Sequence, residues 1–226
     1  MKCVFVSKDN LWSNTLFENL SKDVNASWSR VTDNIDLQML SKSQIKPDWV
    51  FFFHWSNIVP ERIWKNLRCV TIHTSNLPEG RGGSPIQNQI INCVMSSHVN
   101  AIEMSNILDG GPIYCSLPVT LQGSLTDVWL AISHQSKNLI KMCVEENLSP
   151  VEQDLSNSSI AKRRKTSQIP MANIEDIIDL YDYVRMLDAD GYPKSQFNVG
   201  NFSIELSRSS IEGDSILCDA RIRVLK

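Results

Sequence analysis

The sequence lacks the patterns that mark several broad classes of protein. None of its six cysteines forms a C-x-x-C pair, and no Cys/His group has the spacing of a zinc site. No apolar run comes near the roughly 20 residues that cross a membrane. The apolar stretch in MKCVFVSKDNLW is too short for a signal peptide. The sequence therefore predicts a cytoplasmic protein with free thiols, no metal and no membrane partner.

The chain also lacks a large excess of charge of either sign. It has 22 Lys and Arg residues against 25 Asp and Glu residues, which gives a formal net charge of −3 at pH 7. Binding to nucleic acid rests on clustered cations that neutralise phosphates, so this balance predicts no nucleic-acid partner. The basic run KRRK at 162–165 is typical of a solvated surface, with contact to an anion as the less favoured alternative.

What the chain does have is a regular alternation of strand-like and helix-like segments. The apolar runs KCVFVS, PDWVFFFH and RCVTIH have the length of strands, and leucines at helical spacing follow the first of them. A continuous apolar run such as WVFFF is typical of a parallel strand that is buried on both faces. The alternation predicts an α/β fold with a Rossmann-like, mostly parallel sheet.

Three parts are expected along the 226 residues. Residues 1–145 form the predicted core, which ends in a long helix over SLTDVWLAISHQSKNLIKMCVEEN. Residues 146–173 are polar and predict a linker or loop. Residues 174–226 predict a small α+β extension, in which one helix precedes two strands paired as a hairpin around EGD. An exposed edge of that hairpin would suit a homodimer.

Two histidines end strand-like segments. His54 ends PDWVFFFH and His73 ends RCVTIH, and ligands of open parallel sheets bind beyond the carboxyl ends of the strands. We therefore expect both side chains to border one crevice, with strand capping or a polar gap in the core as the alternative for each. Asp109 in SNILDGGPIY is either a turn aspartate bonded to its own backbone or a carboxylate directed at His73.

The loop EGRGGSP lies a few residues after His73 and leaves backbone exposed. Gly82 and Gly83 permit close approach of a ligand, and Arg81 can bind a phosphate or carboxylate through two parallel hydrogen bonds. Ser84 is the predicted N-cap of a helix over SPIQNQIINCV, whose free N–H groups favour an anion. A tight loop that needs glycine only for its geometry is the alternative.

Three stretches of this sequence resemble the formyltetrahydrofolate-dependent formyltransferases. IHTSNLPEGRGGSPIQNQI resembles their His-x-Ser-x-Leu-Pro signature with its following Arg-Gly and Pro-Ile-Gln, and ILDGGPIY resembles their Leu-Asp-x-Gly-Pro-Ile motif. FFFHWSNIVP looks like their folate-side strand and loop, where relatives usually carry Tyr-Gly. The resemblance runs from about residue 48 to 195 and implies the formyltransferase fold.

Within that family, the segment RMLDADGYPK is similar to a C-terminal segment of the branch that acts on nucleotide-linked amino sugars. Glycinamide ribonucleotide formyltransferases carry a glycine-rich loop where this chain reads VSKDN, and methionyl-tRNA formyltransferases are longer, with a basic C-terminal domain. The resemblance therefore implies formyl transfer from N10-formyltetrahydrofolate, without a metal, to the amine of a UDP-4-amino-4,6-dideoxyhexose for a pseudaminic-acid-type surface glycan. A formyltetrahydrofolate hydrolase and a catalytically silent nucleotide-sugar-binding module are the alternatives.

The resemblance also assigns chemical roles. His73, as imidazolium, would stabilise the negative charge that develops on the formyl oxygen, and Asp109 would hold the imidazole and help to remove the proton of the amine. The family usually has Asn two residues before this histidine, where the present chain has Thr71. Thr71 offers one hydroxyl donor, and Asn76 is either a substitute for the missing amide or a turn residue.

The remaining candidate residues fall into two groups. The predicted folate side comprises Phe53, His54, Trp55, Ile58, Leu108 and Asp109, with a core position as the alternative for Trp55. The predicted substrate side comprises Arg81, Gly82, Gly83, Ser84, Gln87, Tyr192 and Lys194, with a solvated surface position as the alternative for Lys194.

Overall fold

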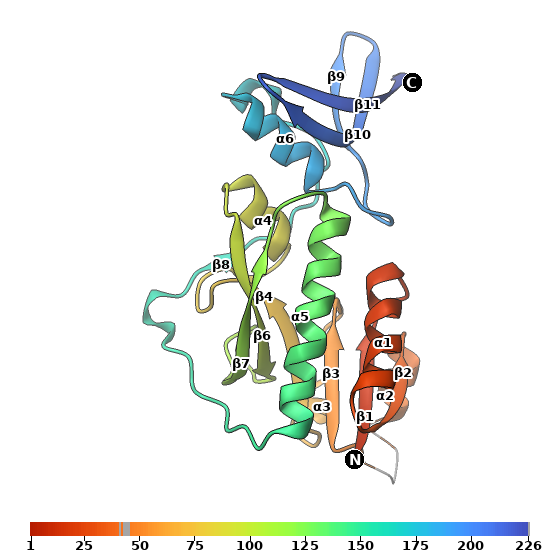
Figure 1. Cartoon of the computed structure of the whole chain (residues 1–226), viewed down its shortest axis with the longest axis vertical. Helices are drawn as coiled ribbons and strands as arrows, with labels where there is room; N and C mark the ends of the chain where they lie inside the picture. Colours follow the sequence, from red (N-terminus) through yellow and green to blue (C-terminus); the bar gives the residue numbers. More distant parts are fainter. Residues whose placement is uncertain (41, 43–45, 226) are drawn as a thin grey trace.

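A six-stranded sheet forms the centre of the protein in the computed structural model, which describes residues 1–40, 42 and 46–225 (Figure 1). The strand order is β2-β1-β3-β4-β6-β7. Their bounds are β1 (Lys2–Ser7), β2 (Ser27–Val31), β3 (Trp49–Phe53), β4 (Cys69–Thr74), β6 (Ser96–Glu103) and β7 (Ile113–Thr120). The first four strands in the order are parallel, whereas β6 and β7 are antiparallel to their neighbours. The predicted mostly parallel, Rossmann-like sheet is thereby confirmed.

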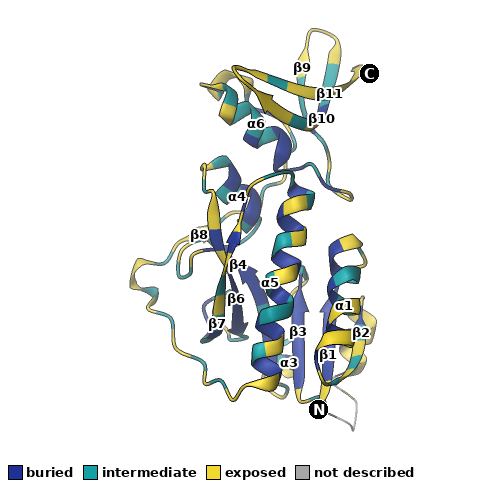
Figure 2. Ribbon diagram, viewed as in Figure 1, coloured by how far each residue is buried: buried dark blue, intermediate teal, exposed yellow. Residues whose placement is uncertain are grey.

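Helices cover both faces of this sheet. They are α1 (Leu11–Asp23), α2 (Asn34–Leu40), α3 (Glu61–Trp64) and α5 (Leu125–Glu145). Successive side chains of a strand point to opposite faces. Phe51 and Phe53 therefore enter the larger core cluster with α1 and α5, while Phe52 enters a second cluster with α2 and α3. Burial on both faces explains why WVFFF is continuously apolar, and Figure 2 shows β3 as buried along its length.

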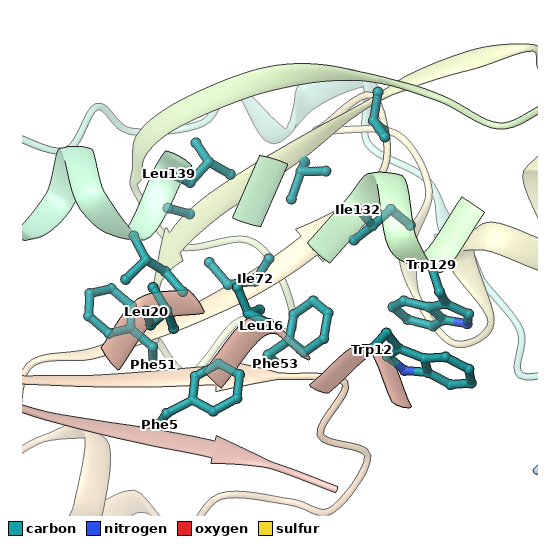
Figure 3. Packing of buried hydrophobic residues seen from close by; sticks show 14 of the residues in the cluster. Phe5, Trp12, Leu16, Leu20, Phe51, Phe53, Ile72, Trp129, Ile132 and Leu139 are labelled. Carbon is teal, nitrogen blue, oxygen red and sulfur yellow. The ribbon is translucent and has the colours of Figure 1, made fainter. Parts of the chain in front are cut away.

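The long helix α5 begins at a capping box. The Ser124 hydroxyl accepts from the Asp127 N–H, and the Asp127 carboxylate accepts from the Ser124 N–H, so two of the free donors at the helix end are satisfied. Trp129 of α5 stacks on Trp12 of α1, with ring centroids 5.5 Å apart and planes 7° from parallel (Figure 3). No helix in the described part of the chain is long and apolar enough to cross a membrane.

The polar stretch after α5 is not the structureless linker that its composition predicts. Figure 1 shows it running from the end of α5 past the edge of the sheet, back toward α4 (Pro85–Ile91). On the way it forms two short 3-10 turns, η1 (Leu155–Asn157) and η2 (Met171–Asn173), and the strand β8 (Ile160–Ala161). β8 pairs in parallel with β5 (Arg81–Gly82). Two-residue strands have no periodicity that sequence analysis can detect.

The C-terminal extension lies at one end of the core (Figure 1). It contains three strands, not the two predicted. Its elements are α6 (Ile177–Arg185), β9 (Ser195–Val199), β10 (Phe202–Glu212) and β11 (Ser215–Val224). The sheet has the order β11-β10-β9. The short, largely polar β9 was missed because it pairs with only five residues of β10 and carries little apolar signal. Val184 and Leu206 centre a small core between α6 and this sheet.

Candidate active site

His73 and Asp109 lie side by side in the structure, as their motifs predict. The His73 Nδ1 and Asp109 Oδ2 atoms are 3.4 Å apart, and both side chains are largely shielded from solvent. The other ring nitrogen of His73, Nε2, lies 3.1 Å from the carbonyl oxygen of Gly80. A carbonyl only accepts, so Nε2 carries a proton in this arrangement. The Asp109 carboxylate also accepts from the Gly82 N–H at 2.9 Å. The site thus joins the end of β4, the glycine loop and the turn that holds Asp109.

Backbone geometry holds the turn that presents Asp109. Asp109 has a φ of 49°, in the left-handed region that aspartate tolerates better than most residues. Gly111 approaches the Glu103 carbonyl so closely that a Cβ there would overlap its oxygen. The Gln153 amide donates to the carbonyls of Asp109 and Gly111 at 3.1 and 2.7 Å. Gln153 is a functional candidate that sequence reasoning missed, because it sits in a polar stretch without a motif.

The position of Arg81 in the glycine loop predicts a side chain that projects toward a substrate. In the structure the side chain is turned inward instead and is 6% exposed. The guanidinium donates to the Leu108 carbonyl at 3.3 Å and to the Ser158 hydroxyl at 3.1 Å. Burial and these bonds make Arg81 a brace between the Asp109 turn and the segment around η1. Its role as a two-pronged ligand for a substrate anion is therefore corrected.

The His54 side chain lies against the aromatic residues of α1 and α5. Phe53 already points toward α1 and α5, so a regular strand would turn His54 to the opposite face. Its φ of 49° instead directs the ring toward Trp12 and Trp129, with centroids 5.7 and 4.5 Å away. One left-handed residue thus reverses the direction expected of the His54 side chain, and a crevice shared by His54 and His73 stays a prediction.

Polar contacts fix the tautomer of His54. The Trp12 indole N–H only donates, and it points at His54 Nδ1 from 3.4 Å, beside the Asn10 amide at 3.1 Å. Nδ1 therefore accepts, and the proton lies on Nε2, which is 3.2 Å from the Tyr192 hydroxyl. The Trp129 indole donates to the same hydroxyl at 3.2 Å. Tyr192 thus closes on the core from the C-terminal extension, next to His54.

Burial is the main influence on the acid–base behaviour of this cluster. Burial, with smaller contributions from the charges of Lys8 and Arg163, lowers the pKa of His54 to about 4. Burial also raises the pKa of Tyr192, against hydrogen bonds from Trp129 and Gln87 that favour the phenolate. His54 is consequently a neutral acceptor and donor, which suits positioning better than proton transfer near pH 7.

The asparagine that contacts His73 is Asn100, not the predicted Asn76. Thr71 is half-buried on β4, and alternation along the strand places it on the same face as His73. Asn76 is exposed, and its Oδ1 lies 2.9 Å from His98 Nδ1 rather than at His73. Asn100 stands opposite His73 in the β4–β6 register, is buried, and donates to the His73 carbonyl at 3.3 Å. The sequence contained one indication that Asn100 belongs to the site, because it is a polar residue within the apolar segment HVNAIE.

The predicted folate-side residues separate into buried and exposed side chains. Phe53 is 1% exposed and belongs to the main core. Trp55 packs against the second cluster, so the alternative of a core aromatic describes it better than a free stacking wall. Ile58 and Leu108 are 94% and 62% exposed. These two are the side chains of the group that remain available to an apolar ligand.

The bare backbone of the glycine loop is covered by the chain itself. A Cβ at Gly83 would stand 2.6 Å from the Cβ of Arg163, which shows how closely the segment around β8 crosses this loop. Ser84 has a φ of 49° and makes no capping bond, and its hydroxyl accepts from the Arg164 N–H at 3.1 Å. The chain itself therefore covers Gly82 and Gly83, where a ligand was predicted to approach. Ser84 does occupy the predicted N-cap position of α4, with Pro85 after it, although its side chain makes no capping bond.

The last of the predicted substrate-side residues is engaged within the extension, where Lys194 pairs with Asp188 at 2.9 Å. No three His, Cys, Asp or Glu side chains of the described residues gather in a way that could hold a metal ion.

Comparison with known proteins identifies relatives of this chain. A family profile described as "Methionyl-tRNA formyltransferase, C-terminal domain" matches residues 164–223. A methionyl-tRNA formyltransferase from a Nitratiruptor species is 27% identical over 169 residues, which cover 67% of this chain and 56% of that protein. The chain spans about half the length of the curated relatives it matches.

Solved structures of similar proteins lead to the same kind of relative. Methionyl-tRNA formyltransferase from Clostridium thermocellum has a TM-score of 0.90 at 27% identity, covering 99% of this chain and 100% of that one. HypX from Aquifex aeolicus in complex with tetrahydrofolic acid has a TM-score of 0.74 at 16% identity, covering 92% of this chain and 38% of that one, a likeness in fold alone. Fold and matches together support a formyl-transfer enzyme. Within that class, they support membership of the formyltransferase family.

These matches overturn the predicted amino-sugar substrate. The Nitratiruptor and Clostridium thermocellum relatives, similar in sequence and in structure, are both named methionyl-tRNA formyltransferases. RMLDADGYPK falls inside the region that matches the methionyl-tRNA formyltransferase profile, so this segment does not separate the two branches. Chain length does not separate them either, because this chain covers 100% of the Clostridium thermocellum chain. The hydrolase and the silent binding module find no support among the relatives, and the exclusion of nucleic acid rested only on net charge, which does not describe local clusters.

Proposed function

We propose that the chain transfers the formyl group of N10-formyltetrahydrofolate to the amine of methionyl-tRNA. The observation that carries the chemistry is the buried His73–Asp109 pair beside the glycine loop. The names of the relatives supply the acceptor. The tetrahydrofolic acid in the HypX structure supports the donor.

In the proposed reaction the neutral amine attacks the formyl carbon, and negative charge develops on the formyl oxygen. That oxygen takes the place of the Gly80 carbonyl at the Nε2–H of His73, so the ring exchanges one acceptor for another. The Asp109 carboxylate accepts the proton of the amine, directly or through water. The bond from the formyl carbon to N10 breaks, and N10 receives a proton. The products are tetrahydrofolate and the N-formylated acceptor.

Two surface features fit these ligands. The exposed side chains of Ile58 and Leu108 offer apolar contact to the pteridine, and the backbone of residues 52–58 and 107–109 is its proposed cradle. A basic cavity of about 480 Å³ lies between α4 and residues 161–166 and suits a phosphate of the acceptor. Within the described residues, Lys162, Arg163 and Arg164 have no carboxylate within 4.0 Å, unlike Lys137 or Lys194.

The proposal is tested by following tetrahydrofolate release and formyl-methionine formation. The full chain is incubated with N10-formyltetrahydrofolate and charged methionyl-tRNA, with uncharged tRNA and free methionine as acceptor controls. We expect release only with the charged tRNA. Replacement of His73 by Ala should lower kcat roughly 100- to 1,000-fold, as loss of one oxyanion donor typically does. His134→Ala, at an exposed position of α5, is the matched control. Release without formyl-methionine, or full activity of His73→Ala, would show the proposal to be wrong.

A further inference from the structure

The outer edge of the C-terminal sheet is a strand without a neighbour. β11 is the last strand in the order β11-β10-β9, and all of its residues except Ile216 are exposed. The opposite edge is protected, because the Ile169 N–H donates to the Gln196 carbonyl and the Gln196 N–H donates to the Ser167 carbonyl. No described residue pairs in this way along the outer side of β11. A ten-residue strand with free backbone donors and acceptors is a template for another strand.

One face of this sheet is apolar beyond the reach of α6. Val199 stands opposite Phe202, and Phe202 stands opposite Val224, so the three share one face across three strands. Ile222 lies on the same face, two residues from Val224. These side chains are 55%, 48%, 70% and 63% exposed in that order. A contiguous exposed apolar group at a sheet edge marks a surface that association would bury.

The opposite face of β11 carries charges of both signs. Asp219, Arg221 and Arg223 alternate with the apolar residues along the strand. Arg223 pairs with Glu205 and Asp219 pairs with Arg208 within the chain. Arg221 has no carboxylate partner among the residues that the structure describes. Charged residues usually protect an edge strand from pairing, so their order along β11 decides which neighbour the edge accepts.

The sequence of β11 is complementary to itself in one antiparallel register. With a two-fold axis at Ala220, Asp219 of one copy stands opposite Arg221 of the second copy, and the symmetric pair repeats the contact. On the other face, Cys218 stands opposite Ile222, and Ile216 opposite Val224. Every cross-strand pair on that face is then apolar, and the two innermost pairs on the charged face join opposite charges. Such pairs stabilise antiparallel sheets, whereas like charges directly opposite destabilise them.

We propose that β11 pairs with β11 of a second copy of this chain, which joins the two C-terminal sheets into one six-stranded sheet. The occupant of the edge is a second copy because the register that satisfies the backbone also matches the charges and the apolar side chains. The dimer leaves the His73–Asp109 pair in each core, and it is independent of the proposed acceptor.

The mass in solution tests the association. Light scattering on the full chain should give twice the 25.6 kDa of one chain at micromolar concentration. Arg221→Asp places Asp opposite Asp at two symmetric positions and should raise the dimer Kd at least about tenfold. Arg62→Asp, an exposed arginine of α3, makes the same charge change away from the edge and should leave the dimer intact. A monomeric wild type, or a dimer that survives Arg221→Asp unchanged, overturns the proposal.

Disulfide trapping tests the register. Directly opposite Cα atoms of antiparallel strands lie about 4.5–5.5 Å apart, within the range that a disulfide spans. In a Cys218→Ser background, Ala220→Cys should form an intermolecular disulfide when an oxidant is added, because this residue meets its own copy at the axis. Ile222→Cys in the same background faces position 218 and should not, whereas Ile222→Cys with the native Cys218 should. Equal cross-linking of all three variants, or none in any, contradicts the register.

Discussion

Acid should destabilise this protein through His54, and the size of the effect follows from its surroundings. Burial holds the folded pKa at about 4, against 6.5 for an ordinary histidine. Below about pH 6.5 the unfolded chain binds a proton on this residue, and the folded chain does not until about pH 4. Stability is therefore complete above the unfolded pKa and is lost as pH falls through this window. The full loss is about 3 kcal/mol, at about 1.4 kcal/mol per pH unit.

Structure explains why the folded chain resists this proton. Protonation at Nδ1 would set a third N–H against the Trp12 indole and the Asn10 amide, which both donate to that atom. His54→Asn removes the titration and keeps a residue that tolerates a φ of 49°. Urea unfolding of both proteins at pH 7 and pH 4.5 then isolates the effect, because all other groups titrate alike.

We expect wild type to lose about 2 kcal/mol more than His54→Asn over this interval. His134→Asn, at an exposed position on α5, should behave as wild type. If His54→Asn loses as much stability as wild type between the two pH values, the assignment of acid sensitivity to His54 is refuted.

Two further substitutions test the contact between the core and the C-terminal extension and the proposed binding site for the acceptor. Arg185→Ala removes the buried partner of Asp182 and a donor to the Leu121 carbonyl. The free energy of unfolding in urea should therefore fall by about 3–5 kcal/mol. A loss below about 1 kcal/mol would contradict the expectation that the substitution leaves the Asp182 carboxylate buried and unpaired. Arg163→Gln should lower by about 1 the slope of log K against log salt for methionyl-tRNA binding. Arg62→Gln should leave that slope unchanged. Equal slopes in both variants would show that the basic cavity does not bind the acceptor.

The core of the fold was predictable because its signals are local. A run such as WVFFF needs burial on both faces, and that requires a parallel strand with helices above and below. The histidine and aspartate of the site were also predictable, since each lies in a short motif. Their roles in catalysis stay a prediction. The branch of the family was not predictable from RMLDADGYPK, because that segment belongs to a region matched by the other branch.

Contacts that span long stretches of chain were not predictable. Gln153 reaches the Asp109 turn across 44 residues, and the Arg164 N–H reaches Ser84 across 80. Neither segment has a periodicity or motif that announces its partner. The cover over the glycine loop and the brace made by Arg81 belong to the same class of contact.

By itself, the sequence determined the alternation of the main strands and helices of the core, the burial of the central strand and the two motifs that meet at the site. It did so because apolar periodicity and short motifs are properties of neighbouring residues. Only the tertiary structure decided which way the key side chains face. A left-handed φ at His54 directs its ring toward Trp12 and Trp129, and the same backbone region at Asp109 belongs to the turn that presents its carboxylate to His73. Such reversals depend on packing around single residues, which no pattern of residue types records.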